Sequence, residues 1–111
     1  KATIMFVLQP KPTFKAAVSI PVPGGSDGKI TFIFKHKGKK DLQAYFNSLS
    51  ATEGEAKTDI EALLELVDGW EGVSEKFSAE NLELLLDAYP GAALALYETY
   101  RKELLEGRSK N

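Results

Sequence analysis

Apolar and polar residues alternate in two segments near the start of the chain, and a period of two is typical of half-buried β-strands. Between them, residues 21–28 read PVPGGSDG, and such a stretch rich in proline and glycine favours a turn. We therefore predict an antiparallel hairpin that pairs Phe14–Ile20 with Ile30–Lys35 and packs the Phe32/Phe34 side against helices. Ile4–Leu8 could add a short strand before Pro10. The alternating apolar residues are Phe14, Ala16, Val18, Ile20, Ile30, Phe32 and Phe34.

From Lys39 onward, apolar residues recur at the spacing of an α-helix. The first helical stripe consists of Leu42, Tyr45, Phe46 and Leu49. A second helix is expected to begin at Thr58, because Thr58 and Glu61 have the spacing of a capping box, and to end at Gly69. The apolar face of this second helix consists of Ile60, Leu63, Leu64 and Val67.

The C-terminal part predicts two further helices. Ser78 is the expected N-cap of the third helix, because a serine side chain can accept a hydrogen bond from the free N–H groups at a helix start. A proline disfavours helical geometry in the residue before it, so this helix should end at Tyr89. The fourth helix should then begin at Pro90 and end at Gly107. Its expected inward-facing residues are Ala93, Leu94, Tyr97, Tyr100 and Leu104.

Length and composition fit one folded domain, residues 1–111, with an α+β fold. The hairpin part is expected within 12–37, and the part with about four helices within 39–107. The 111 residues are 43% hydrophobic and 27% charged, which is a globular composition. A net charge of −2 argues against nucleic acid as the main partner. The longest apolar runs fall well short of the roughly 20 residues that span a bilayer, so we expect no membrane span.

The residue types favour a protein without catalytic activity, cofactor or metal. The chain has no cysteine and one histidine, which excludes disulfides, thiolate metal sites and multi-histidine metal sites. The glycine-rich loop 23–28 leads into a strand rather than a helix, so a hairpin connection is favoured over a phosphate loop. The basic cluster Lys35–Lys40 fits a solvated loop, and it leaves open a nucleic-acid-binding regulator. His36, within this cluster, is expected to be exposed.

Aromatic residues are concentrated in the C-terminal half. Trp70 and Phe77 could pack over the ends of the second and third helices, or one of them could lie in a groove that binds a partner. Tyr89, Tyr97 and Tyr100 are expected in more open positions, because each has an apolar ring and a hydroxyl group that prefers water or a partner. The candidate protein-binding residues are Trp70, Phe77, Leu85, Tyr89, Tyr97 and Tyr100.

Seven short segments occur in an order and spacing that together resemble the tail assembly chaperones of long-tailed bacteriophages and prophages. The segments are 12–14, 20–24, 30–35, 69–73, 77–78, 89–93 and 110–111, which read PTF, IPVPG, ITFIFK, GWEGV, FS, YPGAA and KN. The resemblance extends from Pro12 to Asn111 and so covers nearly the whole chain.

The resemblance implies a non-enzymatic protein of the host bacterial cytoplasm that is absent from the mature virion. Such a chaperone coats the poorly soluble tape measure protein and brings tail tube subunits to it. Trp70–Tyr100 would contact the tape measure protein, and exposed apolar patches would favour self-association. A frameshifted longer form would continue after Asn111. Two alternatives remain open: a small tail or connector subunit that stays in the virion, and a nucleic-acid-binding regulator that uses Lys35–Lys40.

Overall fold

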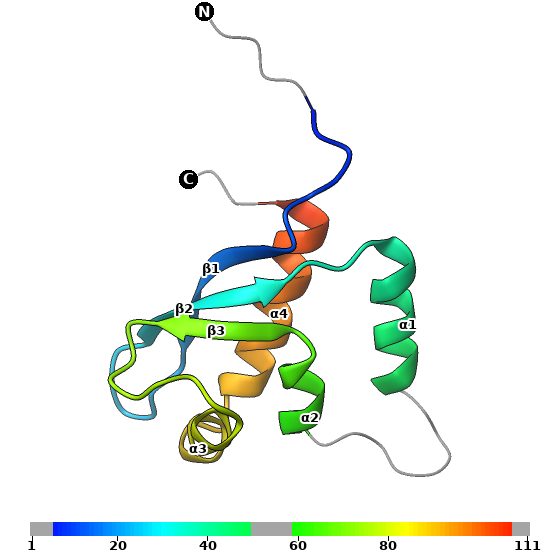
Figure 1. Cartoon of the computed structure of the whole chain (residues 1–111). Helices are drawn as coiled ribbons and strands as arrows, with labels where there is room; N and C mark the ends of the chain where they lie inside the picture. Colours follow the sequence, from blue (N-terminus) through cyan, green and yellow to red (C-terminus); the bar gives the residue numbers. More distant parts are fainter. Residues whose placement is uncertain (1–5, 50–58, 108–111) are drawn as a thin grey trace, which may run out of the picture.

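A computed structural model of the chain describes residues 6–49 and 59–107 (Figure 1). In chain order its elements are β1 (Thr13–Ile20), β2 (Gly28–Lys35), α1 (Lys39–Leu49), α2 (Asp59–Leu64), β3 (Val67–Glu71), α3 (Ala79–Ala88) and α4 (Ala92–Glu106). The predicted α+β fold, with an N-terminal hairpin and four helices, is confirmed.

The hairpin pairs in a register that keeps the alternating apolar residues of both strands on one face. Phe14 lies opposite Phe34, and Val18 lies opposite Ile30. One face of the hairpin is buried and includes Phe32, Phe34 and Val18, while Lys15 on the other face is exposed. The predicted packing of the Phe32/Phe34 side against the helices is therefore confirmed.

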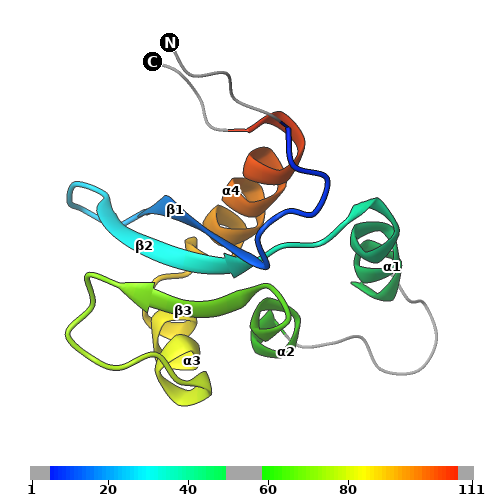
Figure 2. The ribbon, with the colours of Figure 1, turned by 45° about the horizontal axis from the view of Figure 1, so that its top comes forward.

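A third strand completes the sheet, and here the prediction from sequence is wrong. The order is β1-β2-β3, with β3 antiparallel to β2, and Figure 2 shows β2 between its two neighbours. We expected Val67 to continue the second helix and Gly69 to end it, but α2 ends at Leu64. The chain then turns, and β3 supplies hydrogen-bond partners to the free edge of β2. The free energy gained by pairing the open edge of β2 outweighs the preference for a longer helix that the spacing of the apolar residues indicated.

The β2–β3 pairing contains an irregularity that sets which residues face the core. Gly69 lies opposite Ile33, and the next pair is Val67 with Phe34, which leaves Asp68 as an extra residue. This β-bulge lets both Val67 and Trp70 lie on the same side as the buried phenylalanines. Without the extra residue, period-two alternation would send Val67 and Trp70 to opposite faces.

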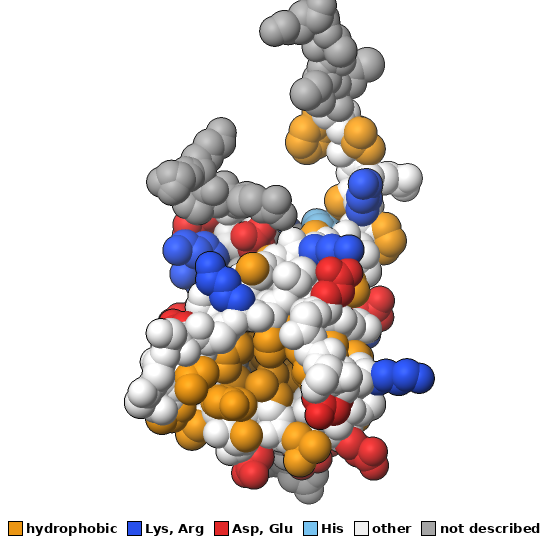
Figure 3. Space-filling view, turned by 90° about the vertical axis from the view of Figure 1, so that its left-hand side faces the viewer, with side chains coloured by type: hydrophobic (Ala, Val, Ile, Leu, Met, Phe, Trp, Pro, Cys, Tyr) orange, Lys and Arg blue, Asp and Glu red, His pale blue; other side chains and the backbone are white. Residues whose placement is uncertain are grey.

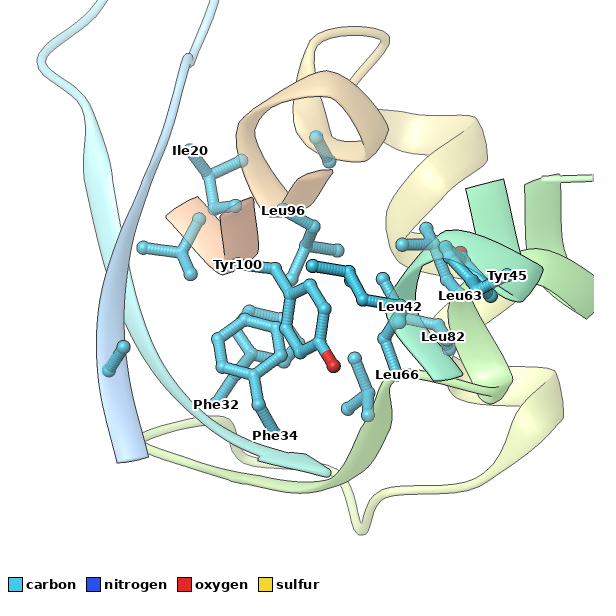
Figure 4. Packing of buried hydrophobic residues seen from close by; sticks show 14 residues of the cluster. Ile20, Phe32, Phe34, Leu42, Tyr45, Leu63, Leu66, Leu82, Leu96 and Tyr100 are labelled. Atoms are coloured by element: carbon cyan, nitrogen blue, oxygen red, sulfur yellow. The ribbon is translucent and has the colours of Figure 1, made fainter. Parts of the chain in front are cut away.

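The core lies between the sheet and the helices that cover its one face (Figure 4). In Figure 1, α4 lies behind the sheet and α1 stands to one side, beside α2. Tyr45 of α1 joins this core, and its hydroxyl donates a hydrogen bond to the Ala62 carbonyl at 2.8 Å. Phe46, which we expected in the same apolar stripe, is 37% exposed and contacts the Tyr45 ring.

The inward face of α4 agrees with the predicted one at Tyr100 and differs from it at Leu94. Its buried residues are Ala92, Leu96 and Tyr100, whereas Leu94, which we expected to face inward, is 62% exposed. Ala93, Tyr97 and Leu104 are half-buried beside this line. The spacing of apolar residues allowed two overlapping faces, and packing on β1 selected the one that places Leu96 and Tyr100 on the sheet.

The predicted helix ends are confirmed for α3 and α4, with one shift at the start of α4. The Ser78 hydroxyl accepts a hydrogen bond from the Asn81 N–H at 3.0 Å, and Tyr89 after α3 is extended. Gly107 has a positive φ of 73° and ends α4. However, α4 begins at Ala92 rather than at Pro90, because Tyr89 to Gly91 form a turn closed by a hydrogen bond from the Ala92 N–H to the Tyr89 carbonyl.

Two predictions fall partly or wholly outside the described residues. Thr58, the expected N-cap of the second helix, lies outside them. For the short strand expected at Ile4–Leu8, residues 6–8 are described and form no strand. Within the described parts of the chain, no helix is both long and apolar enough to cross a lipid bilayer.

Candidate protein-binding groove

An open apolar groove of about 440 Å³ lies between the ends of β2 and β3, the loop after β3, and α3. Figure 3 shows a hollow with apolar surface on the side of the molecule where the β1–β2 loop, the β3–α3 loop and α3 lie in Figure 1. The volume is within the range of about 300–1,000 Å³ that is typical of binding pockets. The main apolar residues of the groove are Ile30, Trp70, Val73, Leu84, Leu85 and Tyr89.

Trp70 forms the β3 side of the groove and is held by contacts on three sides. Its ring meets Phe32 edge-on at 6.0 Å and Phe77 nearly perpendicularly at 5.3 Å, both measured between ring centroids. The Trp70 Nε1–H donates a hydrogen bond to the Glu75 carbonyl at 2.9 Å. Trp70 therefore belongs to a strand and packs on the sheet, rather than over the ends of two helices as the packing hypothesis held. It is half-buried, so part of the ring also faces the groove.

The loop after β3 folds back over Trp70 because its first residue is a glycine. Gly72 has a φ of +87°, a conformation that residues with a Cβ rarely adopt. The loop then runs to Ser78, the N-cap of α3, and the Asn81 side chain donates to the Lys76 carbonyl at 2.8 Å. This bond joins the loop to the start of α3, while the Trp70 bond to Glu75 joins the loop to β3. The groove is the space that remains between β3 and α3.

One face of α3 forms the other side of the groove. Asn81, Leu84, Leu85 and Ala88 line it, and their spacing places them on one side of a helix. Leu82 points instead to the core and is fully buried. Leu84 is 64% exposed, which leaves an apolar side chain at the groove opening without cover from its own chain. Uncovered apolar surface of this kind marks interaction sites on many soluble proteins.

The lining groups favour binding of apolar side chains. The polar side chains of the groove belong to Ser74, Glu75 and Asn81. The Ser74 hydroxyl donates to the Glu75 carboxylate at 2.6 Å, so this pair already satisfies part of its hydrogen bonding. Among the residues that the structure describes, no group of three or more histidine, cysteine, aspartate or glutamate side chains could hold a metal ion.

Three of the six candidate protein-binding residues line the groove: Trp70, Leu85 and Tyr89. Phe77 packs behind Trp70 and supports it. Tyr97 is half-buried on α4 and contacts Tyr45. The structure therefore brings four of the six candidates together and places both α4 tyrosines elsewhere.

Tyr100 is a core residue, and the expectation of an open position is wrong for it. Its side chain is 1% exposed, and its ring lies 5.3 Å from Phe34 and 5.9 Å from Phe14. The hydroxyl donates to the Lys35 carbonyl at 2.7 Å, at the end of β2. Burial raises the pKa of Tyr100 to about 12, because the ionised form would lose its hydration.

The basic cluster Lys35–Lys40 is partly engaged in contacts within the chain. The Lys35 Nζ donates to the Leu64 carbonyl at 3.3 Å, and the Lys37 Nζ lies 5.5 Å from the centre of the Tyr45 ring. His36, expected to be exposed, is half-buried, and its backbone N–H donates to the Pro12 carbonyl. These contacts favour a structural role over a patch that is free to bind phosphates.

Three of the main apolar residues of the groove were not among the candidates: Ile30, Val73 and Leu84. Ile30 was assigned only to the inner face of the hairpin, and Val73 lies in a loop without any periodic pattern. The exposed position of Leu84 could have been found, because it widens the apolar stripe of α3 beyond what a single core face needs.

The comparison with protein families matches the chain over residues 2–111 to the family described as phage tail assembly chaperone. No curated protein and no solved structure matches the chain.

Proposed function

The chain belongs to the phage tail assembly chaperone family, and on this basis we propose that it binds the tape measure protein and keeps it soluble. We further propose that it recruits tail tube subunits to the tape measure protein before the tail polymerises. The observation that supports the proposal is the open apolar groove formed by Trp70, Leu85 and Tyr89.

We propose that the tape measure protein presents amphipathic helices to this chain, and an open apolar groove suits the apolar face of such a helix. An amphipathic helix binds by placing side chains at i, i+3, i+4 and i+7 into such a groove. Covering that stripe removes apolar area from water and prevents the helices from associating with one another. In this mechanism the chaperone contributes binding alone, without a catalytic step or a cofactor.

The proposal includes the location and fate of the protein. It acts in the host cytoplasm and leaves before the tail is complete, when tail tube subunits replace it on the tape measure protein. A small tail or connector subunit would instead remain in the particle. Mass spectrometry of purified virions separates these two functions, because a chaperone is expected to be missing from them.

Self-association is also part of the proposal. Phe6 and Leu8 are 89% and 88% exposed and lie on the segment that precedes β1. Exposed apolar side chains of this size favour contacts between copies. Sedimentation velocity over a hundredfold range of protein concentration should show a rising average mass, and a constant monomer mass would contradict this part.

The main test is co-expression of the tape measure protein of the same phage with variants of this chain. Leu84→Glu places a charge at the groove opening, and Leu94→Glu is the matched control, because Leu94 is an equally exposed leucine on α4. We expect the wild type and Leu94→Glu to keep the tape measure protein in the soluble fraction, and Leu84→Glu to lose this activity. If the tape measure protein is equally soluble without the chain, the proposed function fails.

A further inference from the structure

We propose that the groove takes a cationic amphipathic helix, whose apolar residues enter the groove while lysine or arginine residues on one flank face α3. The inference rests on the proposed function, since the tape measure protein would supply the helix. It goes further by assigning the charge and the orientation of the bound segment. The argument depends on where the acidic residues of α3 lie relative to the groove.

Three acidic residues form a continuous edge along α3, here called the acidic edge: Glu80, Glu83 and Asp87. Successive residues of a helix are about 100° apart around its axis. These three residues therefore lie next to Leu84, on one flank of the α3 face that lines the groove. The core-facing residue Leu82 lies on the opposite flank of the groove-lining face. All three acidic residues are exposed, and α3 contains no lysine or arginine.

The negative charge is concentrated in the segment that forms the groove. Between Glu71 and Tyr89 there are five acidic residues and one basic residue, a formal charge of −4 in a chain whose total is −2. Among the described residues, the one ion pair found in this segment joins Glu71 to Lys15, on the outer face of the sheet. The acidic edge therefore presents charge that no cation of the described chain neutralises.

The side of the groove opposite α3 is mainly apolar and includes Ile30 and Val73, both half-buried. The one acidic residue among the groove-lining residues, Glu75, lies in the loop after β3, and its carboxylate accepts a hydrogen bond from Ser74. A helix that lies along the groove consequently meets mainly apolar surface with a single carboxylate on one flank, and the three carboxylates of the acidic edge on the other. Cationic residues on the flank next to α3 gain Coulomb attraction, and acidic residues there are repelled.

The length of the groove fits about two turns of a bound helix. Its α3 side runs from Asn81 to Ala88, which corresponds to roughly 10 Å at 1.5 Å per residue. Over this length an amphipathic helix presents three or four apolar side chains on one face. The expected ligand is therefore a short helical stretch with an apolar stripe and two or three cations along one edge of it.

The fluorescence of Trp70 measures peptide binding directly, because Trp70 is the sole tryptophan and lies in the groove. Two synthetic helical peptides without tryptophan or tyrosine would carry the same leucine stripe, one flanked by lysines and the other by glutamates. We expect the lysine peptide to change Trp70 emission and to bind about tenfold more tightly at low salt, with a difference that shrinks as salt is added. Equal affinity of the two peptides would overturn the inference.

Charge reversal of the acidic edge tests the assignment to α3. Glu83→Lys combined with Asp87→Lys should weaken the lysine peptide about three- to tenfold and strengthen the glutamate peptide. The matched control is Glu98→Lys combined with Glu106→Lys, two exposed acidic residues of α4. The neutral variant Glu83→Gln with Asp87→Gln should give an intermediate result. An unchanged preference in these α3 variants would contradict the inference.

The same variants separate this inference from the proposed function. If the wild type solubilises the tape measure protein and the reversed α3 variant does so equally well, the inference fails while the proposed function stands. If the wild type discriminates between the peptides but does not solubilise the tape measure protein, the proposed function fails and the charge preference of the groove stands. If Trp70 emission responds only to the concentration of the chain itself, a second copy occupies the groove and the inference is wrong.

Discussion

Trp70 lies directly opposite Phe32 across the β2–β3 pairing, and the two rings meet edge-on at 6.0 Å. Phe32 is fully buried, whereas Trp70 is half-buried and forms one side of the groove. This pair therefore connects the core of the protein to its candidate binding surface. A change that displaces Trp70 should affect both stability and partner binding.

Trp70→Ala should lower the free energy of unfolding by roughly 2–5 kcal/mol, because it removes a large ring that packs on Phe32 and Phe77. Trp70→Phe keeps an aromatic ring but loses the hydrogen bond to the Glu75 carbonyl, so a loss of about 1 kcal/mol is expected. Urea unfolding followed by circular dichroism measures both. Wild-type stability of Trp70→Ala together with lost partner binding would show that the ring acts in binding alone.

Tyr100→Phe should lower the free energy of unfolding by about 1–3 kcal/mol. The substitution leaves the aromatic packing in place and removes the hydroxyl that donates to the Lys35 carbonyl. Tyr89→Phe is the control, because Tyr89 is half-buried at the groove, and it should stay within about 0.5 kcal/mol of the wild type. Equal stabilities of the two variants would mean that the hydrogen bond to Lys35 contributes nothing.

Alkaline pH should destabilise the protein through Tyr100. Burial raises the pKa of Tyr100 from its usual value of 10.0 to about 12, so the folded state keeps a proton that the unfolded state loses. The stabilisation is complete below pH 10 and is lost as the pH rises from 10 to 12. Burial also raises the pKa of Tyr45, which acts in the same direction.

The measurement is the free energy of unfolding from pH 8 to pH 11, for the wild type and Tyr100→Phe. Above pH 10 the wild type should lose stability more steeply than the variant, because the variant lacks one of the titrating groups. Parallel curves for the two proteins would show that Tyr100 does not titrate differently in the folded and unfolded states.

Gly91→Ala should lower the free energy of unfolding by about 1–3 kcal/mol. A Cβ at position 91 would lie 3.0 Å from the Pro21 Cγ, so the β1–β2 loop would have to move away from the turn before α4. Gly28→Ala is the control, since nothing lies within 4 Å of a Cβ there. Thermal unfolding of both variants measures the difference. A melting temperature of Gly91→Ala equal to that of the wild type would show that the β1–β2 loop moves aside without loss of stability.

The sequence by itself determined the elements whose signals are local. The alternation in Phe14–Ile20 and Ile30–Lys35 specified the hairpin and its buried face, because a slip of one residue would turn every apolar side chain away from the core. Ser78 and Gly107 likewise specified helix ends through the hydrogen bonding of one side chain and the backbone freedom of one glycine. For the candidate site, the sequence identified Trp70, Leu85 and Tyr89.

Tertiary structure decided what depends on partners far along the chain. Val67–Glu71 forms a strand because the edge of β2, more than 30 residues earlier, has free N–H and C=O groups to pair with. The local sequence of Val67–Glu71 does not indicate this distant partner. On α4, the choice between the faces of Leu94 and Leu96 depended on which one met the sheet. Tyr100 was expected on the inward side of α4, but its complete burial against Phe34 depended on the packing of α4 on the sheet. Val73 lines the groove because the loop turns back at Gly72. Local spacing sets which faces a segment can bury, but only the assembled sheet and helices select among them.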